Sequence, residues 1–267
     1  MPENSSKNWT PEALGAAAAA LASARQEKTP IRPLRESGLV SLEDAYAIQA
    51  INTQWWKAAG RTSPGAKIGL TSKAVQAQLG VSEPDFGLLW GDLAFNAGDQ
   101  VAMTHFIQPK AEAEIAFVLE RDLSSPTLTL KDVISAVAYV LPAVEIVDSA
   151  IADWNIALVD TVADNASSGA YVLGDSPRTL RQVDLRTCGM LLSRAGTLVS
   201  HGVGAACLGN PLNAVLWLAR KMVETKTPLR AGDLVLSGAL GPMVPVATGE
   251  NYLVEIQGFS PFSFNFK

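Results

Sequence analysis

The stretch at residues 108–120 reads QPKAEAEIAFVLE and alternates in the manner of a β-strand. Because successive side chains of a strand point to opposite faces, Glu112 and Glu114 share one face, and the other face is wholly apolar. The glutamate face continues into Ala116 and Val118, which predicts that it is buried too. Two adjacent carboxylates on a buried face are costly unless a cation or a proton compensates them.

This pattern predicts a metal site, with an exposed sheet edge carrying two solvated glutamates as the alternative. Glu145 is expected to be the third ligand, because it is the only charge inside the apolar run at residues 139–148, YVLPAVEIVD. Charges inside such runs are usually paired or bound to a metal. The alternative for Glu145 is a buried ion pair with a lysine or an arginine. Pro142 in the same run predicts an edge position or a bulge.

Composition narrows the chemistry. The chain has 267 residues, of which 48% are apolar and 18% charged, so it has room for one large domain or for one domain with a small appendage. It contains only two histidines, His105 and His201, which leaves little material for a histidine zinc site or a Ser-His-Asp triad. Oxygen ligands favour Mg²⁺ or Mn²⁺. No Walker-type or GxGxxG loop supports a nucleotide cofactor.

Charge and cysteine content bear on partners and location. The net charge is −5 and no basic cluster occurs, which argues against nucleic acid as a partner. Two cysteines, Cys188 and Cys207, without a CxxC motif fit a reducing compartment. The N-terminus lacks the pattern of a signal peptide, and the alanine-rich run at 14–21 is too short to span a bilayer. We therefore expect a cytoplasmic protein that does not bind membranes.

The order of elements predicts an α+β fold. Residues 1–8 are expected to be frayed, and two helices, at about 11–26 and 41–59, to form a helical cap spanning residues 1–64. Residues 65–267 are expected to form a mixed-sheet catalytic domain, with a turn or loop at 84–87 and a short strand at 88–95. Further helices are expected at 72–79, 130–138 and 154–160 and from Asn210 onward; further strands are expected at 66–70, 167–174, 185–193, 197–203, 234–237, 252–257 and 260–267.

Two single residues stand out near the start of the catalytic domain. Lys67 is the only charge in the apolar strand AKIGL and is suited to stabilise a developing enolate or to donate a proton. Its alternative is a lysine that snorkels from a strand end. Asp85, in EPDFG, is either a pocket carboxylate or a turn residue.

Two later segments are also rich in polar or glycine residues. The segment DTVADNASSG contains Asp160, Asp164 and Asn165. These polar residues are expected either to bind a ligand or to form capping and turn hydrogen bonds. Ser237 and Gly238 open the turn of LSGALGPMVPV, whose backbone amides are suited to meet a carboxylate.

Taken together, these residues resemble the 2-keto-4-pentenoate hydratases of aromatic meta-cleavage catabolism, which belong to the fumarylacetoacetate hydrolase superfamily. The resemblance covers about residues 40–250 in family order. The matching segments are KIGLTSKAVQAQLGV, EPDFGLL, QPKAEAEIAFVL, LPAVEIVDS, VDTVADNASSGAYVLG, LGNPLNAVLWLARKM and LSGALGPMVPV.

The resemblance implies a Mg²⁺- or Mn²⁺-dependent lyase that hydrates 2-hydroxypenta-2,4-dienoate to 4-hydroxy-2-oxopentanoate. It also implies a curled mixed β-sheet, close to a β-roll or barrel, with a small helical N-terminal region, in a homo-oligomer. In this reading the sites are metal ligands Glu112, Glu114 and Glu145, catalytic residues Lys67 and Asp85, and substrate-binding residues Leu70, Thr71, Asp164, Ser167, Ser237 and Gly238.

Three alternatives remain open within this resemblance. The first is 4-oxalocrotonate decarboxylase, and the second is a hydratase of a substituted or longer 2-hydroxydienoate. The third is a non-catalytic partner subunit, since hydratases of these pathways are expected to associate with a pathway aldolase or decarboxylase. Ala150 stands where many relatives carry arginine, and Ala66 stands where relatives often carry arginine or histidine. Both departures bear on the exact substrate.

Overall fold

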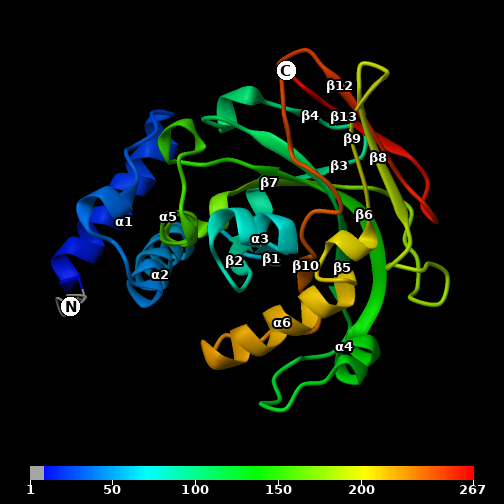
Figure 1. The fold of residues 1–267 in the computed structure, drawn as a ribbon, viewed down its shortest axis with the longest axis horizontal. Coiled ribbons are helices and arrows are strands. Elements are labelled where there is room, and N and C mark those ends of the chain that lie inside the picture. The colour runs from blue at the N-terminus through cyan, green and yellow to red at the C-terminus, as the bar shows by residue number, and fades with distance from the viewer. Residues whose placement is uncertain (1–8) are drawn as a thin grey trace.

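The N-terminal part of the chain forms two long helices. The computed structural model describes residues 9–267, so the prediction of a frayed segment at 1–8 lies outside the described residues. Helix α1 (Pro11–Glu27) begins at Thr10, whose side chain accepts from the Ala13 amide, and α2 (Leu42–Ala58) begins at Ser41, which caps the Asp44 amide. A 3₁₀ turn, η1 (Leu34–Ser37), lies between them. The predicted helices are thus confirmed (Figure 1).

The helical cap packs onto the rest of the chain. Its apolar core includes Leu21 of α1 and Ile48 of α2, and the same cluster contains Ile151 and Val162 from the sheet-bearing part. Figure 1 shows α1 and α2 on one side of the molecule, with α5 between them and the sheet. The cap thus shares its core with its neighbour, and the division at residue 64 stays a prediction.

The larger sheet contains eight strands among the described residues. Seven follow the order β2-β1-β10-β5-β6-β7-β3, and β11 pairs with β5. The pairs β1/β10 and β3/β7 are parallel and the other pairs are antiparallel, so the sheet is mixed. Its strands are β1 (Gly65–Gly69), β2 (Asp85–Leu89), β3 (Ala94–Asn96), β5 (Lys110–Leu119), β6 (Val137–Val147), β7 (Ser168–Leu173), β10 (Leu234–Leu236) and β11 (Val244–Pro245).

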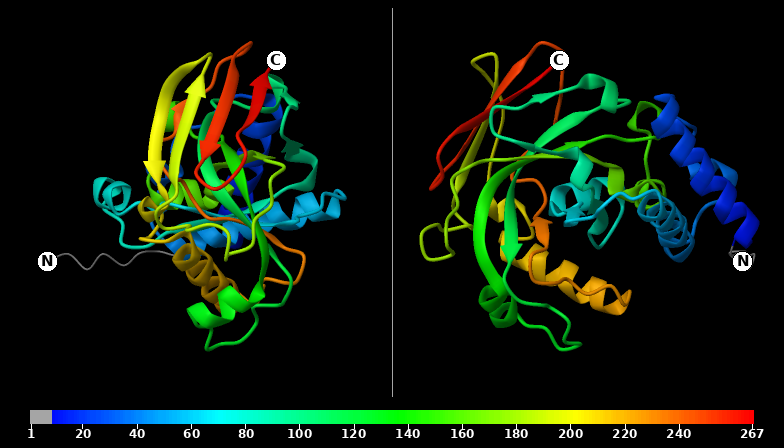
Figure 2. Two further views of the ribbon diagram at one scale, coloured as in Figure 1. Left: turned by 90° about the vertical axis from the view of Figure 1, so that its right-hand side faces the viewer. Right: turned by 180° about the vertical axis from the view of Figure 1, so that it is seen from behind.

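A second sheet closes one side of the fold. It has the order β4-β13-β12-β8-β9 and stands beside the strongly curved β5 and β6 (Figures 1 and 2). Ile115 and Phe117 of β5 share one large apolar cluster with Tyr252 and Phe264 of this second sheet. Its strands are β4 (Gln100–Val101), β8 (Gly189–Arg194), β9 (Thr197–Val203), β12 (Asn251–Ile256) and β13 (Phe262–Phe266). The predicted α+β class with a curled mixed sheet is confirmed.

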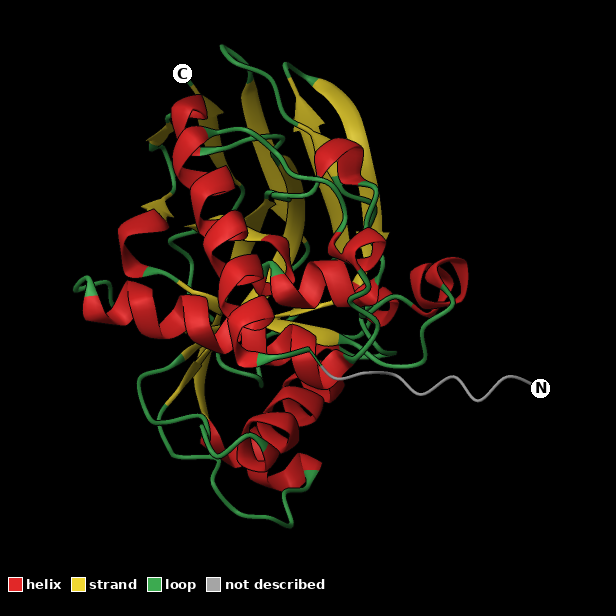
Figure 3. Cartoon of the chain, turned by 90° about the vertical axis from the view of Figure 1, so that its left-hand side faces the viewer, coloured by secondary structure: helices red, strands yellow, loops and turns green. Residues whose placement is uncertain are grey.

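Short helices cover the remaining faces, and helices lie in front of the strands in the view of Figure 3. The amphipathic α6 packs against α4. No helix among the described residues is long and apolar enough to cross a membrane. The α-helices are α3 (Lys73–Leu79), α4 (Leu130–Ala136), α5 (Leu158–Ala163) and α6 (Pro211–Glu224); the 3₁₀ turns are η2 (Gly91–Leu93), η3 (Met103–His105), η4 (Ala152–Trp154), η5 (Asn165–Ser167) and η6 (Gly204–Ala206).

Four local predictions were wrong. Asp85 begins strand β2 rather than lying in a loop, and residues 88–95 are divided among β2, η2 and β3. The helix predicted at 154–160 is replaced by η4 and the start of α5. Pro142 lies in the central strand β6, not at a sheet edge. The Pro142 carbonyl accepts from the Gly174 amide just beyond the last β6–β7 pair. Proline has no N–H to donate, and at this position the pairing of β6 with β7 ends, so the ladder between them is not interrupted.

Candidate active site

Five of the predicted site residues, all with ionisable side chains, lie on one face of the larger sheet. On β5, Ala113, Ile115 and Phe117 enter the large apolar cluster on one face, while Ala116 enters a smaller cluster on the opposite face. Strand alternation places Glu112 and Glu114 on the side of Ala116, as the sequence predicted. The same alternation places Glu145 of β6, Lys67 of β1 and Asp85 of β2 on that face. One curved surface therefore carries all five groups.

The three glutamates converge. Glu112 and Glu145 are direct partners in the antiparallel register of β5 and β6. One carboxylate oxygen from each of Glu112, Glu114 and Glu145 lies within 4.8 Å of the others. Glu114 is 0% exposed, Glu112 is partly buried, and β5 lies inside the sheet between β10 and β6, so the alternative of two solvated glutamates on an edge strand is wrong.

The oxygens of this cluster fit a hard divalent cation. Glu114 Oε2 accepts a 2.8 Å hydrogen bond from the Gly238 amide. Among the described residues, Glu114 Oε1 is buried without a hydrogen-bond partner, and Glu145 Oε1 is buried with only the Lys67 ammonium beside it. Buried carboxylate oxygens without partners are costly, and a cation with oxygen ligands removes that cost. Glu112, Glu114 and Glu145 are therefore the residues suited to hold Mg²⁺ or Mn²⁺.

Without a cation the cluster favours bound protons. Burial, together with the charge of Glu145, raises the pKa of Glu112 to about 7. Burial also raises the pKa of Glu114 well above its usual value, and the charges of Glu145 and Glu112 act in the same direction. The pKa of Glu145 is raised by burial as well, although Lys67 opposes the shift. These shifts are the behaviour of crowded, desolvated carboxylates.

Lys67 lies against the glutamates. Its Nζ is 3.2 Å from Glu145 Oε1, and both side chains are at most 3% exposed. The snorkelling alternative for Lys67 is therefore wrong, and the ion-pair alternative for Glu145 is present beside the carboxylate cluster. Burial lowers the pKa of Lys67, but the charges of Glu145 and Asp85 outweigh burial and raise it overall. Lys67 is thus a cation in the site.

Asp85 completes the polar group next to Lys67. It pairs with Gly69 in the register of β1 and β2 and is 1% exposed, which rules out the turn alternative. A Cβ atom on Gly69 would lie 2.1 Å from Asp85 Oδ1 and 3.6 Å from Lys67 Nζ. The bare glycine thus leaves the space that both side chains use. Burial raises the pKa of Asp85, while Lys67 acts in the opposite direction.

Two predicted substrate-binding pairs flank this group. Leu70 follows β1 in a left-handed conformation, φ 57°, and its carbonyl accepts from Gln76. Thr71 lies next to Gly238, because a Cβ on that glycine would be 2.4 Å from the Thr71 hydroxyl. The Ser237 amide donates to the Ile115 carbonyl as an extension of the ladder. The carboxylate that meets the Gly238 amide is the chain's own Glu114.

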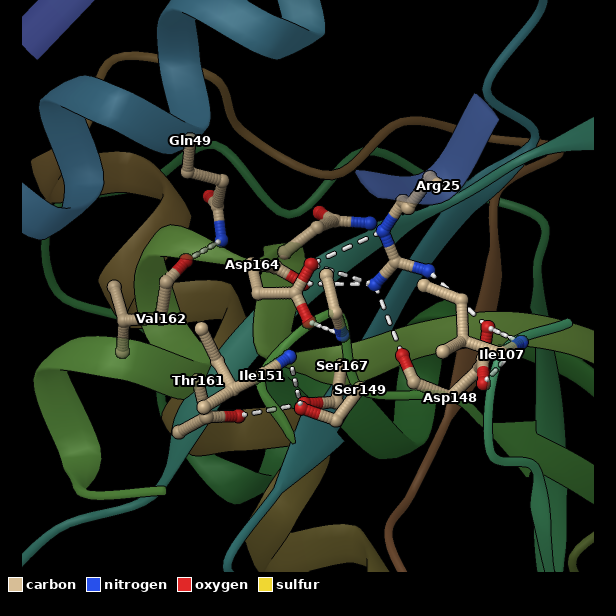
Figure 4. Close-up of polar contacts among 12 residues, drawn as sticks. Arg25, Gln49, Ile107, Asp148, Ser149, Ile151, Thr161, Val162, Asp164 and Ser167 are labelled. Carbon is tan, nitrogen blue, oxygen red and sulfur yellow. Dashed lines mark hydrogen bonds and ion pairs between the residues drawn. The ribbon is translucent and has the colours of Figure 1, made fainter. Parts of the chain in front are cut away.

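Asp164 and Ser167 lie in a polar network that the sequence did not reveal (Figure 4). Arg25 of α1 donates to Asp164 Oδ1 from Nε at 3.0 Å and from Nη2 at 2.7 Å. The other oxygen of Asp164 accepts from the Ala150 amide at 2.8 Å. Ser167 Oγ lies 3.3 Å from Thr161 Oγ1. Asp164 thus already has protein partners, and its role toward substrate stays a prediction.

Comparison with known proteins identifies the family. The sequence pattern described as fumarylacetoacetate (FAA) hydrolase C-terminal matches residues 58–266. The chain belongs to this family.

Curated relatives are similar over nearly the whole chain. The 2-keto-4-pentenoate hydratase of Paraburkholderia xenovorans (strain LB400) is 56% identical over 250 residues, covering 93% of both chains. The 2-keto-4-pentenoate hydratase 2 of Dechloromonas aromatica (strain RCB) is 54% identical over 249 residues, covering 93% of this chain and 95% of the relative. The solved structure of 4-oxalocrotonate decarboxylase from Pseudomonas putida G7, complexed with magnesium and adipate, superposes with a TM-score of 0.94 at 35% identity and covers 98% of this chain and 100% of that one.

Proposed function

We propose that this chain is a metal-dependent hydro-lyase that adds water to 2-hydroxypenta-2,4-dienoate and forms 4-hydroxy-2-oxopentanoate. The observation that carries the proposal is the cluster of Glu112, Glu114 and Glu145 with Lys67 and Asp85 on one buried sheet face. The hydratase relatives at 56% and 54% identity support this substrate. The magnesium of the similar decarboxylase supports the choice of ion.

The glutamates would hold Mg²⁺ or Mn²⁺. When bound, the ion supplies Lewis-acid polarisation of the substrate's 2-oxygen and a template for its carboxylate. The Gly238 amide keeps Oε2 of Glu114 fixed, and Oε1 has no hydrogen-bond partner among the described residues. Lys67 remains protonated because the surrounding carboxylates raise its pKa. Its ammonium group stabilises the negative charge that develops on the 2-oxygen.

Asp85 is suited to move the protons. Because burial raises its pKa, Asp85 holds a proton at higher pH than a solvated carboxyl group does. The substrate loses its 2-hydroxyl proton to solvent, and Asp85 gives a proton to C5, which makes an α,β-unsaturated ketone. The Asp85 carboxylate then takes a proton from the water that attacks C4. Protonation at C3 from solvent completes the product, and Asp85 is again protonated.

Decarboxylation is the second candidate, because the similar solved structure is a 4-oxalocrotonate decarboxylase. The two reactions differ in substrate and product, so one assay separates them. Purified protein is incubated with 2-hydroxypenta-2,4-dienoate or with 4-oxalocrotonate, in Mg²⁺, in Mn²⁺ and in EDTA. We expect metal-dependent consumption of the first substrate. Consumption of only the second, with release of CO₂, would assign the chain to the decarboxylases.

The cytoplasmic location, the homo-oligomer and an association with a pathway aldolase or decarboxylase remain predictions. The same holds for Leu70, Thr71, Asp164, Ser167, Ser237 and Gly238 as substrate-binding residues. Leu70 and Thr71 are the best placed of these, since they directly follow the strand that carries Lys67. We infer that they line the pocket beside Gly238, since Thr71 lies next to that glycine and the Gly238 amide binds Glu114.

A further inference from the structure

Within residues 9–267, the strand that carries Asp85 has only one strand neighbour. β2 is the last strand in the order of the larger sheet and pairs with β1 alone. Its second edge faces α2, through Tyr46 and Gln49, and the α5–β7 connection, and the residues of β2 are buried or partly buried. Buried backbone N–H and C=O groups need partners, because an unpaired group costs about as much as a lost hydrogen bond. Something other than a strand must therefore complete this edge.

The side chain of Asn165 completes it. The Leu88 amide donates to Asn165 Oδ1 at 2.8 Å, and Asn165 Nδ2 donates to the Leu88 carbonyl at 2.9 Å. These are the two hydrogen bonds that an adjacent strand would make with one residue. One step along the edge, Gln49 of α2 donates from Nε2 to the Phe86 carbonyl at 2.9 Å and to the Val162 carbonyl at 3.1 Å. Two buried amide side chains thus replace a missing strand.

The backbone around Asn165 is shaped for this contact. Asn165, Ala166 and Ser167 all have positive φ angles, of 56°, 52° and 52°. Non-glycine residues rarely adopt this conformation, although asparagine tolerates it better than most. A Cβ atom on Gly87 would lie 2.1 Å from the Asn165 carbonyl oxygen, so the turn and β2 approach as closely as a glycine allows. Runs of such strained residues cluster at functional sites.

The preceding residue anchors the turn to the N-terminal helices. Asp164 is held by Arg25 of α1 through hydrogen bonds of 2.7 and 3.0 Å (Figure 4). Gln49, which lies near Val162 in the same view, adds a second tie from α2. The helical cap therefore anchors the turn at residues 164–167, and Asn165 of this turn pairs with the edge of β2.

Asp85 depends on β2 for its position. Asp85 Oδ1 is buried and has no hydrogen-bond partner in the described part of the chain, so direct bonds to this oxygen do not fix the carboxyl group. Lys67, the Thr161 side chain and the Gly69 backbone act on the rest of the carboxyl group. Its position also depends on the β2 backbone, which β1 holds on one side and the two amides hold on the other. Small displacements of a proton-transferring group are costly, since a misplacement of about 1 Å reduces a rate by about 100-fold.

We propose that Asn165 is a positioning residue for Asp85, which it holds in the active site by pairing with the outer edge of β2. The inference rests on the proposed function, because it assumes that Asp85 moves protons in the reaction. Asn165 itself does not touch the substrate in this account.

The test compares Asn165→Gly with Asn210→Gly. Glycine removes the amide of Asn165 without a penalty for the positive φ angle. Asn210 caps α6 through the Leu212 amide and lies outside the site, so its variant controls for the loss of a structural asparagine. For the first variant we expect faster hydrogen exchange at the Leu88 amide, a kcat lower by about 10- to 100-fold and a KM within about 2-fold of wild type. The control variant should show none of these changes.

A double-mutant cycle separates positioning from general destabilisation. If Asn165 acts through Asp85, Asn165→Gly should cause no further loss of kcat in an Asp85→Asn background. Asn165→Asp keeps the acceptor for the Leu88 amide but loses the donor, so its kcat should be intermediate. Unchanged Leu88 exchange, or an undiminished loss of kcat in the Asp85→Asn background, would overturn the proposal. Inactive wild-type protein would instead contradict the proposed function, and the exchange comparison would still decide whether Asn165 holds β2.

Discussion

Lys67 Nζ lies 3.2 Å from Glu145 Oε1, although their strands β1 and β6 are separated in the sheet by β10 and β5. In a flat sheet, strands three spacings apart are about 14 Å apart, and side chains that stand perpendicular to the sheet do not meet across that distance. The curl of the sheet therefore creates the contact. The curl makes one face of the sheet concave, so that the predicted site residues of β1, β2, β5 and β6 converge on that face.

Replacing the lysine tests its role as the cation of the site. For Lys67→Met we expect kcat to fall by at least about 100-fold, because the charge that develops on the substrate loses its partner. Lys73→Met is the matched control, since Lys73 is an exposed residue on the neighbouring α3. The readout is steady-state turnover at saturating Mg²⁺. Near-normal turnover of Lys67→Met would show that the lysine has no part in the chemistry.

Removing a carboxylate tests the metal site. Glu145→Gln should weaken Mn²⁺ binding by at least about 10-fold, since even partners that only support a ligand are worth that much. Glu120, an exposed glutamate just beyond the end of the same sheet's β5, provides the control variant Glu120→Gln. Isothermal titration calorimetry of EDTA-treated protein measures the affinity directly. Equal affinities for the two variants would remove Glu145 from the ligand set.

The stability of the metal-free protein should depend on pH through Glu112. Burial raises the pKa of Glu112 from its usual 4.5 to about 7, so the folded state binds this proton more tightly than the unfolded state. The stabilisation is complete below about pH 4.5 and is lost as the pH rises through about 7.

Thermal melts in EDTA from pH 5 to pH 8 measure this slope. Glu112→Gln should have a flatter slope than wild type, and Mg²⁺ should raise the Tm more at pH 8 than at pH 5, because metal ligands must be deprotonated. Parallel slopes for the two proteins would contradict the assignment of the shifted pKa to Glu112.

Gly69 is predicted to be required for activity, because its lack of a side chain leaves room for the Asp85 carboxyl group. The Cβ of Gly69→Ala would lie 2.1 Å from Asp85 Oδ1, so the carboxyl group must move. We expect kcat to fall by at least about 10-fold while Mn²⁺ affinity is kept. Gly189→Ala, on strand β8, is the control, because the nearest atom to its Cβ is 4.0 Å away. Equal kcat values for the two variants would show that Asp85 tolerates displacement.

Arg25 is predicted to tie the helical cap to the site. Its side chain is 18% exposed, whereas that of Asp164 is only 1% exposed, so Arg25→Met leaves a buried carboxylate unpaired. Removing one partner of a buried ion pair costs about 3–5 kcal/mol. Urea unfolding should show this loss. Arg25→Met combined with Asp164→Asn should recover part of it, whereas Arg230→Met, in an exposed ion pair, should change little.

The glutamate strand shows how much of the site follows from local sequence. Alternation alone placed Glu112 and Glu114 on one face, and a lone charge in an apolar run identified Glu145. The register of β5 and β6 then set Glu112 opposite Glu145, as a shared site requires. Period-2 patterns survive because the buried faces on both sides of the strand enforce them.

The support around the site could not be predicted in the same way. Arg25 lies in an alanine-rich helix where an arginine usually faces solvent, and only the packing of α1 against the Asp148–Asp164 region buries it. Asp85 follows Pro84 and precedes Phe86-Gly87, a composition typical of turns, yet pairing with β1 makes it a strand residue. Partners distant in sequence decide both positions, and no local pattern encodes them.

The most direct test of the central claim is the reaction of 2-hydroxypenta-2,4-dienoate in H₂¹⁸O with Mg²⁺. The product is reduced at the 2-oxo group to stop oxygen exchange and is then analysed by mass spectrometry. The account predicts 4-hydroxy-2-oxopentanoate with one ¹⁸O at C4, formed in Mg²⁺, abolished by EDTA and strongly reduced in Lys67→Met. A product without ¹⁸O at C4, or turnover that persists at full rate in EDTA, would contradict it.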